Sequence, residues 1–131
     1  MTEGEIRTDL RYTKSHEWVR AEGDTLTVGI TDHAQSELTD IVYVNLELKT
    51  RTFAAGAVVL VLESVKTVAD VYAPVAGEVV ATNSELKAHP EYVNKSPYGQ
   101  GWLFRIQVAG PIPLGTLLSP DEYRAHLAAG G

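Results

Sequence analysis

The stretch VVLVLESVKTVADVYAP, residues 58–74, is the most β-prone run in the chain, and it contains one lysine, Lys66, near its middle. A single strand over 58–73 would be much longer than the ~5–6 residues that strands usually have. The run is therefore predicted to fold back on itself as a hairpin. Because no Asn-Gly or Gly-Gly pair marks a turn, the polar cluster ESVKT, residues 63–67, is the predicted turn. This places Lys66 at an exposed tip.

Three roles are open to a lysine at such a tip. A lone lysine in a β-run is most often a solvated residue, or an edge residue that protects against aggregation, and spacing alone favours this role. A Schiff-base lysine would make the chain an enzyme, but such a lysine requires burial and a lowered pKa. The third role is a post-translational attachment site, where the lysine amide carries a swinging cofactor that other enzymes can reach.

Composition narrows the class of protein. The chain has 131 residues, which suits one domain over 1–131. It has no cysteine, so a disulfide framework, a thiolate metal site and a cysteine nucleophile are excluded. With 17 acidic and 11 basic residues the net charge is −6, which argues against nucleic acid as a partner and favours partners with basic surfaces.

The N-terminal segment MTEGEIRTDL has no apolar core, and its acids do not fit an Arg-rich, acid-poor transit peptide. No apolar run in the chain approaches the ~20 residues that span a bilayer. A cytoplasmic protein with no membrane partner is therefore expected.

Short runs rich in Val, Tyr and Thr, separated by turn residues, predict a mostly β protein, either a sandwich or a barrel. Besides 58–64 and 67–73, the predicted strands lie in 12–30 (two strands joined at residues 22–24), 40–48, 77–83 and 101–108. The segment 83–101 is predicted to be a long irregular connection with one helical turn near Glu85.

Two helices are predicted. The first covers 31–38, with Thr31 or Asp32 as its N-cap. The second is a C-terminal helix over 120–129, in which Ser119 and Glu122 form a capping box, Pro120 takes the first position and Gly130 ends the helix. Tyr123 and Leu127, four residues apart, are predicted to share its buried stripe.

The run ESVKTVADVYAPVAGEV, residues 63–79, resembles the modification site of the glycine cleavage system H protein family. Five further stretches resemble the family in the same order: YTKSHEWV, VGITDHAQ, DIVYVNL, PYGQGW and LLSPDEY. The resemblance implies a barrel-sandwich hybrid fold, as in lipoyl and biotinyl domains, with a lipoyl-lysine at Lys66. It also implies that Gly56 and Gly77 are turn glycines on either side of the hairpin.

The residues around Lys66 distinguish between two cofactors of this fold. Biotin carriers usually flank the lysine with methionines, whereas Val65 and Thr67 flank it here and the only methionine is Met1. Glu63, three residues before the lysine and followed by Ser64, also resembles a lipoyl site. Lipoate is therefore predicted rather than biotin.

The resemblance implies a non-catalytic, monomeric shuttle. Its lipoyl arm would carry an aminomethyl group from glycine decarboxylase to the tetrahydrofolate-dependent aminomethyltransferase, and the dithiol to dihydrolipoamide dehydrogenase. A lipoate ligase or lipoyl transferase would attach the cofactor. The alternatives are a lipoyl or biotinyl carrier for another complex and a relay that passes lipoyl groups to other proteins.

No catalytic or metal-binding constellation is found in the sequence. The four histidines, at positions 16, 33, 89 and 126, show neither H-x-x-x-H nor H-E-x-x-H spacing, so no metal site is predicted. One departure from the family concerns the stretch after Gln35, where some members carry a histidine and this chain has Ser36 and Glu37. The role that the family assigns to that histidine is therefore not carried over to this chain.

Two acids match acidic positions of the family motifs, Glu17 in SHEW and Asp70 four residues after the lysine. A loaded arm would end in an amine that is protonated at neutral pH. We expect Glu17 and Asp70 to shelter this amine, although either could be an ordinary surface acid.

Overall fold

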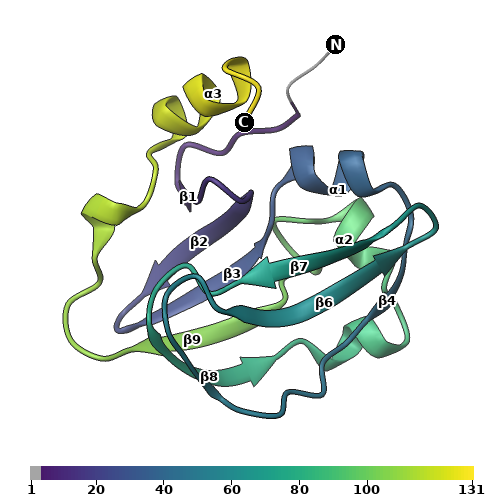
Figure 1. The fold of residues 1–131 in the computed structure, drawn as a ribbon, viewed down its shortest axis with the longest axis horizontal. Coiled ribbons are helices and arrows are strands. Elements are labelled where there is room, and N and C mark those ends of the chain that lie inside the picture. Colours follow the sequence, from purple (N-terminus) through teal and green to yellow (C-terminus); the bar gives the residue numbers. More distant parts are fainter. Residues whose placement is uncertain (1–3) are drawn as a thin grey trace.

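The computed structural model describes residues 4–131, so the first three residues of the acidic N-terminal segment lie outside it. Two antiparallel sheets form the body of the molecule, and Figure 1 shows β6 and β7 lying across the larger sheet. The larger sheet has the strand order β1 (Arg11–Tyr12), β2 (Glu17–Glu22), β3 (Thr25–Ile30), β9 (Phe104–Val108), β8 (Gly77–Thr82) and β5 (Thr52–Phe53). The smaller sheet has the order β4 (Ile41–Val44), β6 (Val58–Ser64) and β7 (Val68–Tyr72). The predicted mostly β, barrel-sandwich architecture is confirmed.

The predicted β6–β7 hairpin is confirmed, with Val61 paired to Asp70 and Glu63 paired to Val68. The β2–β3 hairpin also turns where expected, at Gly23, whose φ of 67° lies in the left-handed region that glycine adopts readily. β4 is shorter than the predicted strand over 40–48. β9 begins at Phe104 rather than 101, because Gly101 lies in a turn packed against the backbone of Tyr92.

Local capping signals placed two helices correctly. α1 (Asp32–Leu38) begins after Thr31, whose side chain accepts a hydrogen bond from the Ala34 backbone N–H. α3 (Pro120–Ala128) begins with the complete capping box of Ser119 and Glu122 and ends one residue earlier than predicted. Gly130, with φ of 88°, follows its end.

The connection between β8 and β9 contains more structure than its sequence predicts. The expected turn is a 3₁₀ helix, η1 (Ser84–Lys87), capped by Asn83. A second short helix, α2 (Tyr92–Lys95), was missed because its N-terminus carries no side-chain cap. Asn94 on α2 explains its position, since its side chain accepts from the Ile41 N–H and donates to the Thr39 carbonyl.

The core has two parts. Aliphatic residues from both sheets fill the space between them, including Leu26, Leu62 and Ile106. A second, mostly aromatic cluster lies beneath α3, where the rings of Tyr12 and Tyr123 stack with centroids 4.5 Å apart. Leu127 packs partly buried against this cluster, so the predicted stripe of α3 is confirmed. Among residues 4–131, no helix has the length and apolar character needed to cross a membrane.

The two glycines implied by the resemblance have different roles. Gly56 adopts φ of 85° in a turn before β6, as expected. The expectation that Gly77 is a turn residue is wrong, because Gly77 is the first residue of β8 and pairs with Phe53 and Val108. A Cβ atom there would lie 2.4 Å from the Gln107 carbonyl oxygen. Close approach of the neighbouring strand, rather than a turn, therefore requires glycine.

Gly77→Ala is expected to destabilise the protein by about 1–3 kcal/mol, because the methyl group must displace the backbone of β9. Gly115→Ala is the matched control, since a Cβ at Gly115 meets no atom within 4 Å and its φ is not positive. Urea unfolding of both variants measures the difference. Equal stability of the two variants would contradict this account of Gly77.

Candidate functional site

The tip of the β6–β7 hairpin is organised by one hydroxyl group. The Ser64 side chain accepts hydrogen bonds from the backbone N–H groups of Lys66 (3.1 Å) and Thr67 (3.0 Å). The Ser64 N–H in turn donates to the Thr67 carbonyl at 2.8 Å. These bonds close the turn without an Asn-Gly pair, and they leave Val65, Lys66 and Thr67 exposed.

The Lys66 amine lies beside the C-terminal end of α1. Its Nζ donates to the Glu37 carbonyl oxygen at 3.3 Å, and the Val65 N–H donates to the Asp40 carbonyl at 3.0 Å. Because the carbonyl end of a helix attracts positive charge, this is a favourable place for an ammonium group. The side chain remains exposed, so another enzyme can reach it.

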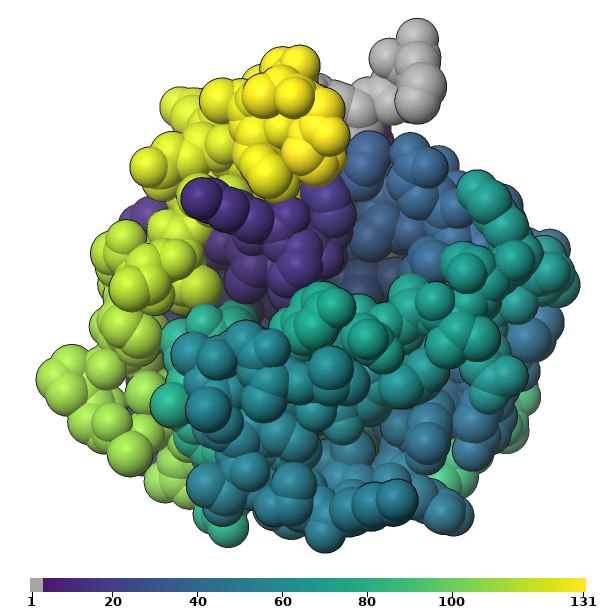
Figure 2. All heavy atoms as spheres, viewed as in Figure 1, coloured from purple at the N-terminus to yellow at the C-terminus, as the bar shows by residue number. Residues whose placement is uncertain are grey.

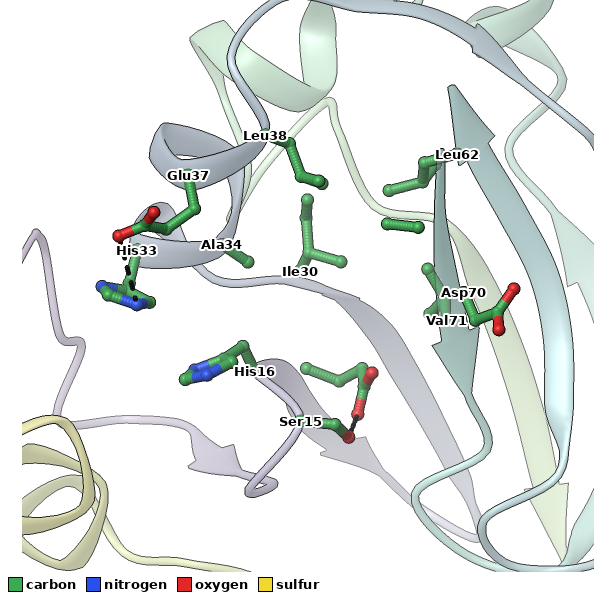
Figure 3. A pocket seen from close by; sticks show the side chains of 12 residues that line it. Ser15, His16, Ile30, His33, Ala34, Glu37, Leu38, Leu62, Asp70 and Val71 are labelled. Carbon is green, nitrogen blue, oxygen red and sulfur yellow. Dashed lines mark hydrogen bonds and ion pairs between the residues drawn. The ribbon is translucent and has the colours of Figure 1, made fainter. Parts of the chain in front are cut away.

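A cavity of about 220 Å³ opens next to this hairpin. Figure 2 shows the surface hollowed between the purple N-terminal segments, the blue α1 region and the teal hairpin. Apolar side chains from β3, α1, β6 and β7 supply much of its wall, and Figure 3 labels five of them: Ile30, Ala34, Leu38, Leu62 and Val71. Ala69 of β7 also lines it. Glu37, whose backbone carbonyl accepts from the Lys66 amine, also borders the cavity.

Glu17 supplies a buried carboxylate to the same cavity. Its side chain, at the start of β2, is 1% exposed. One carboxylate oxygen accepts from the hydroxyls of Thr13 (2.5 Å) and Ser15 (2.6 Å), and the other accepts from the Tyr72 N–H (3.4 Å). Burial raises the pKa of Glu17 above its usual value, and the hydroxyl donors counteract part of that rise.

Asp70 also borders the cavity but is exposed. Figure 3 shows its carboxylate on the far side of β7, pointing away from the apolar wall, as the alternation of a strand requires for the neighbour of buried Val71. The structure therefore places both acids at one cavity without bringing their carboxylates together.

Three histidines gather at one side of the cavity, and two of them, His16 and His33, line it. Sequence spacing did not indicate this grouping. The His16 ring packs against those of His33 (centroids 4.9 Å apart) and His126 (5.7 Å). Its Nδ1 lies 2.8 Å from the Tyr123 hydroxyl. Burial, with the neighbouring histidines, lowers the pKa of His16 to about 4. His16 is therefore neutral near pH 7 and adds no positive charge to the cavity wall.

Glu37 occupies the position at which the sequence departs from part of the family. Its carboxylate lies 3.9 Å from Nε2 of His33, one helical turn away, at the cavity rim. Within residues 4–131, no cluster of three or more histidine or acidic side chains is arranged to bind a metal ion. The site thus combines an accessible amine, an apolar cavity and acidic groups.

The arrangement of the whole chain matches a known family. The sequence model of one protein family, the glycine cleavage H-protein, matches residues 10–129. The chain is 50% identical over 123 residues to the glycine cleavage system H protein of Rubrobacter xylanophilus, covering 94% of this chain and 95% of that one. The corresponding protein of a Psychrobacter species is 51% identical over 123 residues, covering 93% of this chain and 98% of its own.

A solved structure agrees with the sequence matches. The crystal structure of a glycine cleavage system H protein from Mycobacterium marinum has a TM-score of 0.82 at 37% identity, and the match covers 94% of this chain and 99% of that chain. Sequence and fold agree over nearly the full length, and the chain therefore belongs to the glycine cleavage H-protein family.

Proposed function

We propose that this chain is the lipoyl-bearing carrier of the glycine cleavage system and that Lys66 is its attachment site. Membership of the family supports the carrier role. The observation that carries the assignment of the residue is the position of Lys66, exposed at a hairpin tip with its amine in contact with Glu37, a residue that borders the apolar cavity.

The residues around Lys66 fit a lipoyl group. The cofactor is an apolar chain with a sulfur-containing ring, and the aliphatic wall of the cavity offers it a matching surface. Val65 and Thr67 flank the lysine without the methionines typical of biotin carriers. Glu63 and Ser64 complete the motif, and Ser64 holds the turn that presents the amine.

Attachment requires the neutral form of the Lys66 amine and a carboxyl-activated lipoate, such as an acyl adenylate made with a nucleoside triphosphate. The amine attacks the acyl carbon, a C–N bond forms, the C–O bond to the nucleotide breaks and the amine loses a proton to solvent. The resulting amide carries no positive charge. The contact with the Glu37 carbonyl is weakened as a result, which favours release of the side chain from α1.

The lipoyl group supplies sulfur chemistry that this cysteine-free chain lacks. The role of the protein is to present the arm, to shelter it in the cavity and to hold a cationic cargo near Glu17. A short flexible tether gives an effective concentration of order millimolar. The proposed partners are glycine decarboxylase, the aminomethyltransferase, dihydrolipoamide dehydrogenase and a lipoate-attaching enzyme. A cytoplasmic location stays a prediction from the sequence.

The mass of the intact protein, expressed in a host supplied with lipoate, tests the attachment. An addition equal to one lipoyl amide, mapped to Lys66, is expected. Reconstituted glycine decarboxylation, followed by exchange of labelled bicarbonate, tests the glycine cleavage role against service to another complex. An unmodified mass, together with a substrate that borohydride traps on the lysine, would instead indicate a Schiff-base enzyme.

Binding to partner enzymes is expected to weaken with salt. The chain carries a net charge of −6. The distance over which charges act in solution, the Debye length, shortens from ~30 Å at 0.01 M to ~8 Å at 0.15 M ionic strength. Association rates with glycine decarboxylase should fall roughly tenfold over this range if its surface is basic. Stopped-flow or surface-binding kinetics measure this. A rate that stays constant across the range would show that the acidic surface does not steer docking.

A further inference from the structure

β4 presents two consecutive apolar side chains to solvent beside the attachment lysine. Strand side chains normally alternate between the two faces, but the register between β4 and β6 shifts between Ile41 and Tyr43. This irregularity leaves Val42 and Tyr43 53% and 48% exposed, while Ile41 and Val44 stay buried. Bulges of this kind commonly re-aim side chains next to functional sites.

These two residues join others across the smaller sheet. Tyr43 pairs with Glu63, and Glu63 pairs with Val68, so the three form one row across β4, β6 and β7. Val65 at the tip is 67% exposed and Val68 is 61% exposed. We call Val42, Tyr43, Val65 and Val68 the lysine-side patch.

The lysine-side patch differs from other exposed apolar residues of the molecule. Single exposed hydrophobic residues are normal, but a group of them marks an interaction site. Val58 lies at the opposite end of the hairpin, and Val80 and Leu114 lie in β8 and in the 3₁₀ helix η2 (Leu114–Thr116). Among the residues that the structure describes, only the lysine-side patch lies on the same small sheet and hairpin tip as an exposed amine proposed for modification.

Charge defines the kind of partner that fits this surface. Glu63 lies between Tyr43 and Val68 in the row, and exposed Asp70 follows two residues later on β7. Apolar side chains interspersed with acidic groups are complementary to a partner surface that combines apolar groups with basic side chains.

Geometry decides which enzyme must use this surface. An enzyme that acylates Lys66 must bring its active site to the end of the lysine side chain itself, so it must contact the neighbours of that lysine. Enzymes that act later meet the distal end of the attached arm and can dock farther away. We propose that the lysine-side patch is the docking surface for the lipoate-attaching enzyme; this rests on attachment at Lys66 and extends it to the recognition of the unmodified protein.

The test compares acylation rates of the unmodified full-length chain. Tyr43→Ser and Val42→Ser are treated with a lipoate–protein ligase, lipoate and ATP, and the modified fraction is measured by intact mass. Because buried tyrosines dominate many interfaces, Tyr43→Ser is expected to lower kcat/KM by about tenfold or more. Tyr43→Phe, which keeps the ring, should retain most of the rate. Val80→Ser, an equally exposed strand valine outside the patch, should match wild type.

A second measurement separates docking from the reactivity of the amine. A small water-soluble active ester should acylate Lys66 equally fast in Tyr43→Ser and wild type, since no docking is needed. Equal slowing with the ester and the ligase would overturn the proposal, as would ligation of Tyr43→Ser at the wild-type rate. Slowing of glycine decarboxylation alone would assign the patch to a later enzyme and also overturn it. Wild-type protein that never gains the lipoyl mass would instead refute attachment itself.

Discussion

Lys66→Arg is expected to abolish carrier activity while leaving the fold intact. Arginine keeps the positive charge, but its guanidinium stays protonated and cannot form the amide. The tip is exposed, and the hydrogen bond that the Lys66 side chain donates to the Glu37 carbonyl is one that arginine can also donate. The free energy of unfolding should therefore change by no more than ~0.5 kcal/mol.

The experiment measures lipoyl incorporation by mass and glycine decarboxylation in the reconstituted system. Lys49→Arg and Lys95→Arg are suitable controls, because both residues are surface lysines outside the hairpin tip. Both control variants should be lipoylated at Lys66 as wild type is. Loss of at least a thousandfold in decarboxylation, roughly 4 kcal/mol in transition-state terms, is expected for Lys66→Arg alone. Activity that persists in Lys66→Arg, with the lipoyl mass on another lysine, would show that attachment is not specific to the hairpin tip.

Sequence patterns predicted the elements whose signals are local. The capping box of Ser119 and Glu122 is contained within four residues, and α3 begins where it indicates. The hairpin was predicted from the length of the β-prone run. Its turn is closed by hydrogen bonds to the Ser64 hydroxyl, and no turn dipeptide such as Asn-Gly marks it in the sequence. Lys66 was found for the same reason, because its motif is continuous in sequence.

Features that depend on contacts between distant segments could not be predicted in this way. Gly77 is required by the backbone of β9, some thirty residues later, and nothing near it in sequence indicates a strand contact. The grouping of His16, His33 and His126 needs β2, α1 and α3 to meet. Asp70 and Glu17 were assigned the same role from their motifs alone. The direction in which the Asp70 side chain points depends instead on the register of β7 against β6.

Glu17 presents a case in which stability and function are expected to diverge. Burial raises its pKa, so the folded state favours the protonated acid. The stability that this group contributes is therefore full below the unfolded-state pKa and is lost as pH rises through the higher folded-state pKa. Above that folded-state pKa the ionised carboxylate opposes folding, and the free energy of unfolding of Glu17→Gln should lie within about 1 kcal/mol of that of wild type.

The loaded carrier should nevertheless depend on this carboxylate. The cargo amine is protonated at neutral pH, and Glu17 is the acid whose carboxylate is buried at the cavity. A hydrogen bond to a charged group is worth about 1.5–3 kcal/mol, so Glu17→Gln should release cargo on the order of 10- to 100-fold faster. Lipoylation and reoxidation of the arm should be unchanged, because neither involves a cationic cargo.

The measurement follows ammonia or formaldehyde released from loaded protein in the absence of the aminomethyltransferase. Asp70→Asn is the matched comparison, since it also removes an acid at the cavity but one whose carboxylate points away, and a smaller effect is expected of it. The advantage of wild type over Glu17→Gln should shrink as pH falls through the raised pKa of Glu17, because protonation removes the charge that holds the amine. If Glu17→Gln keeps its cargo as long as wild type at neutral pH, the buried carboxylate has no part in sheltering it, and the apolar wall alone protects the arm.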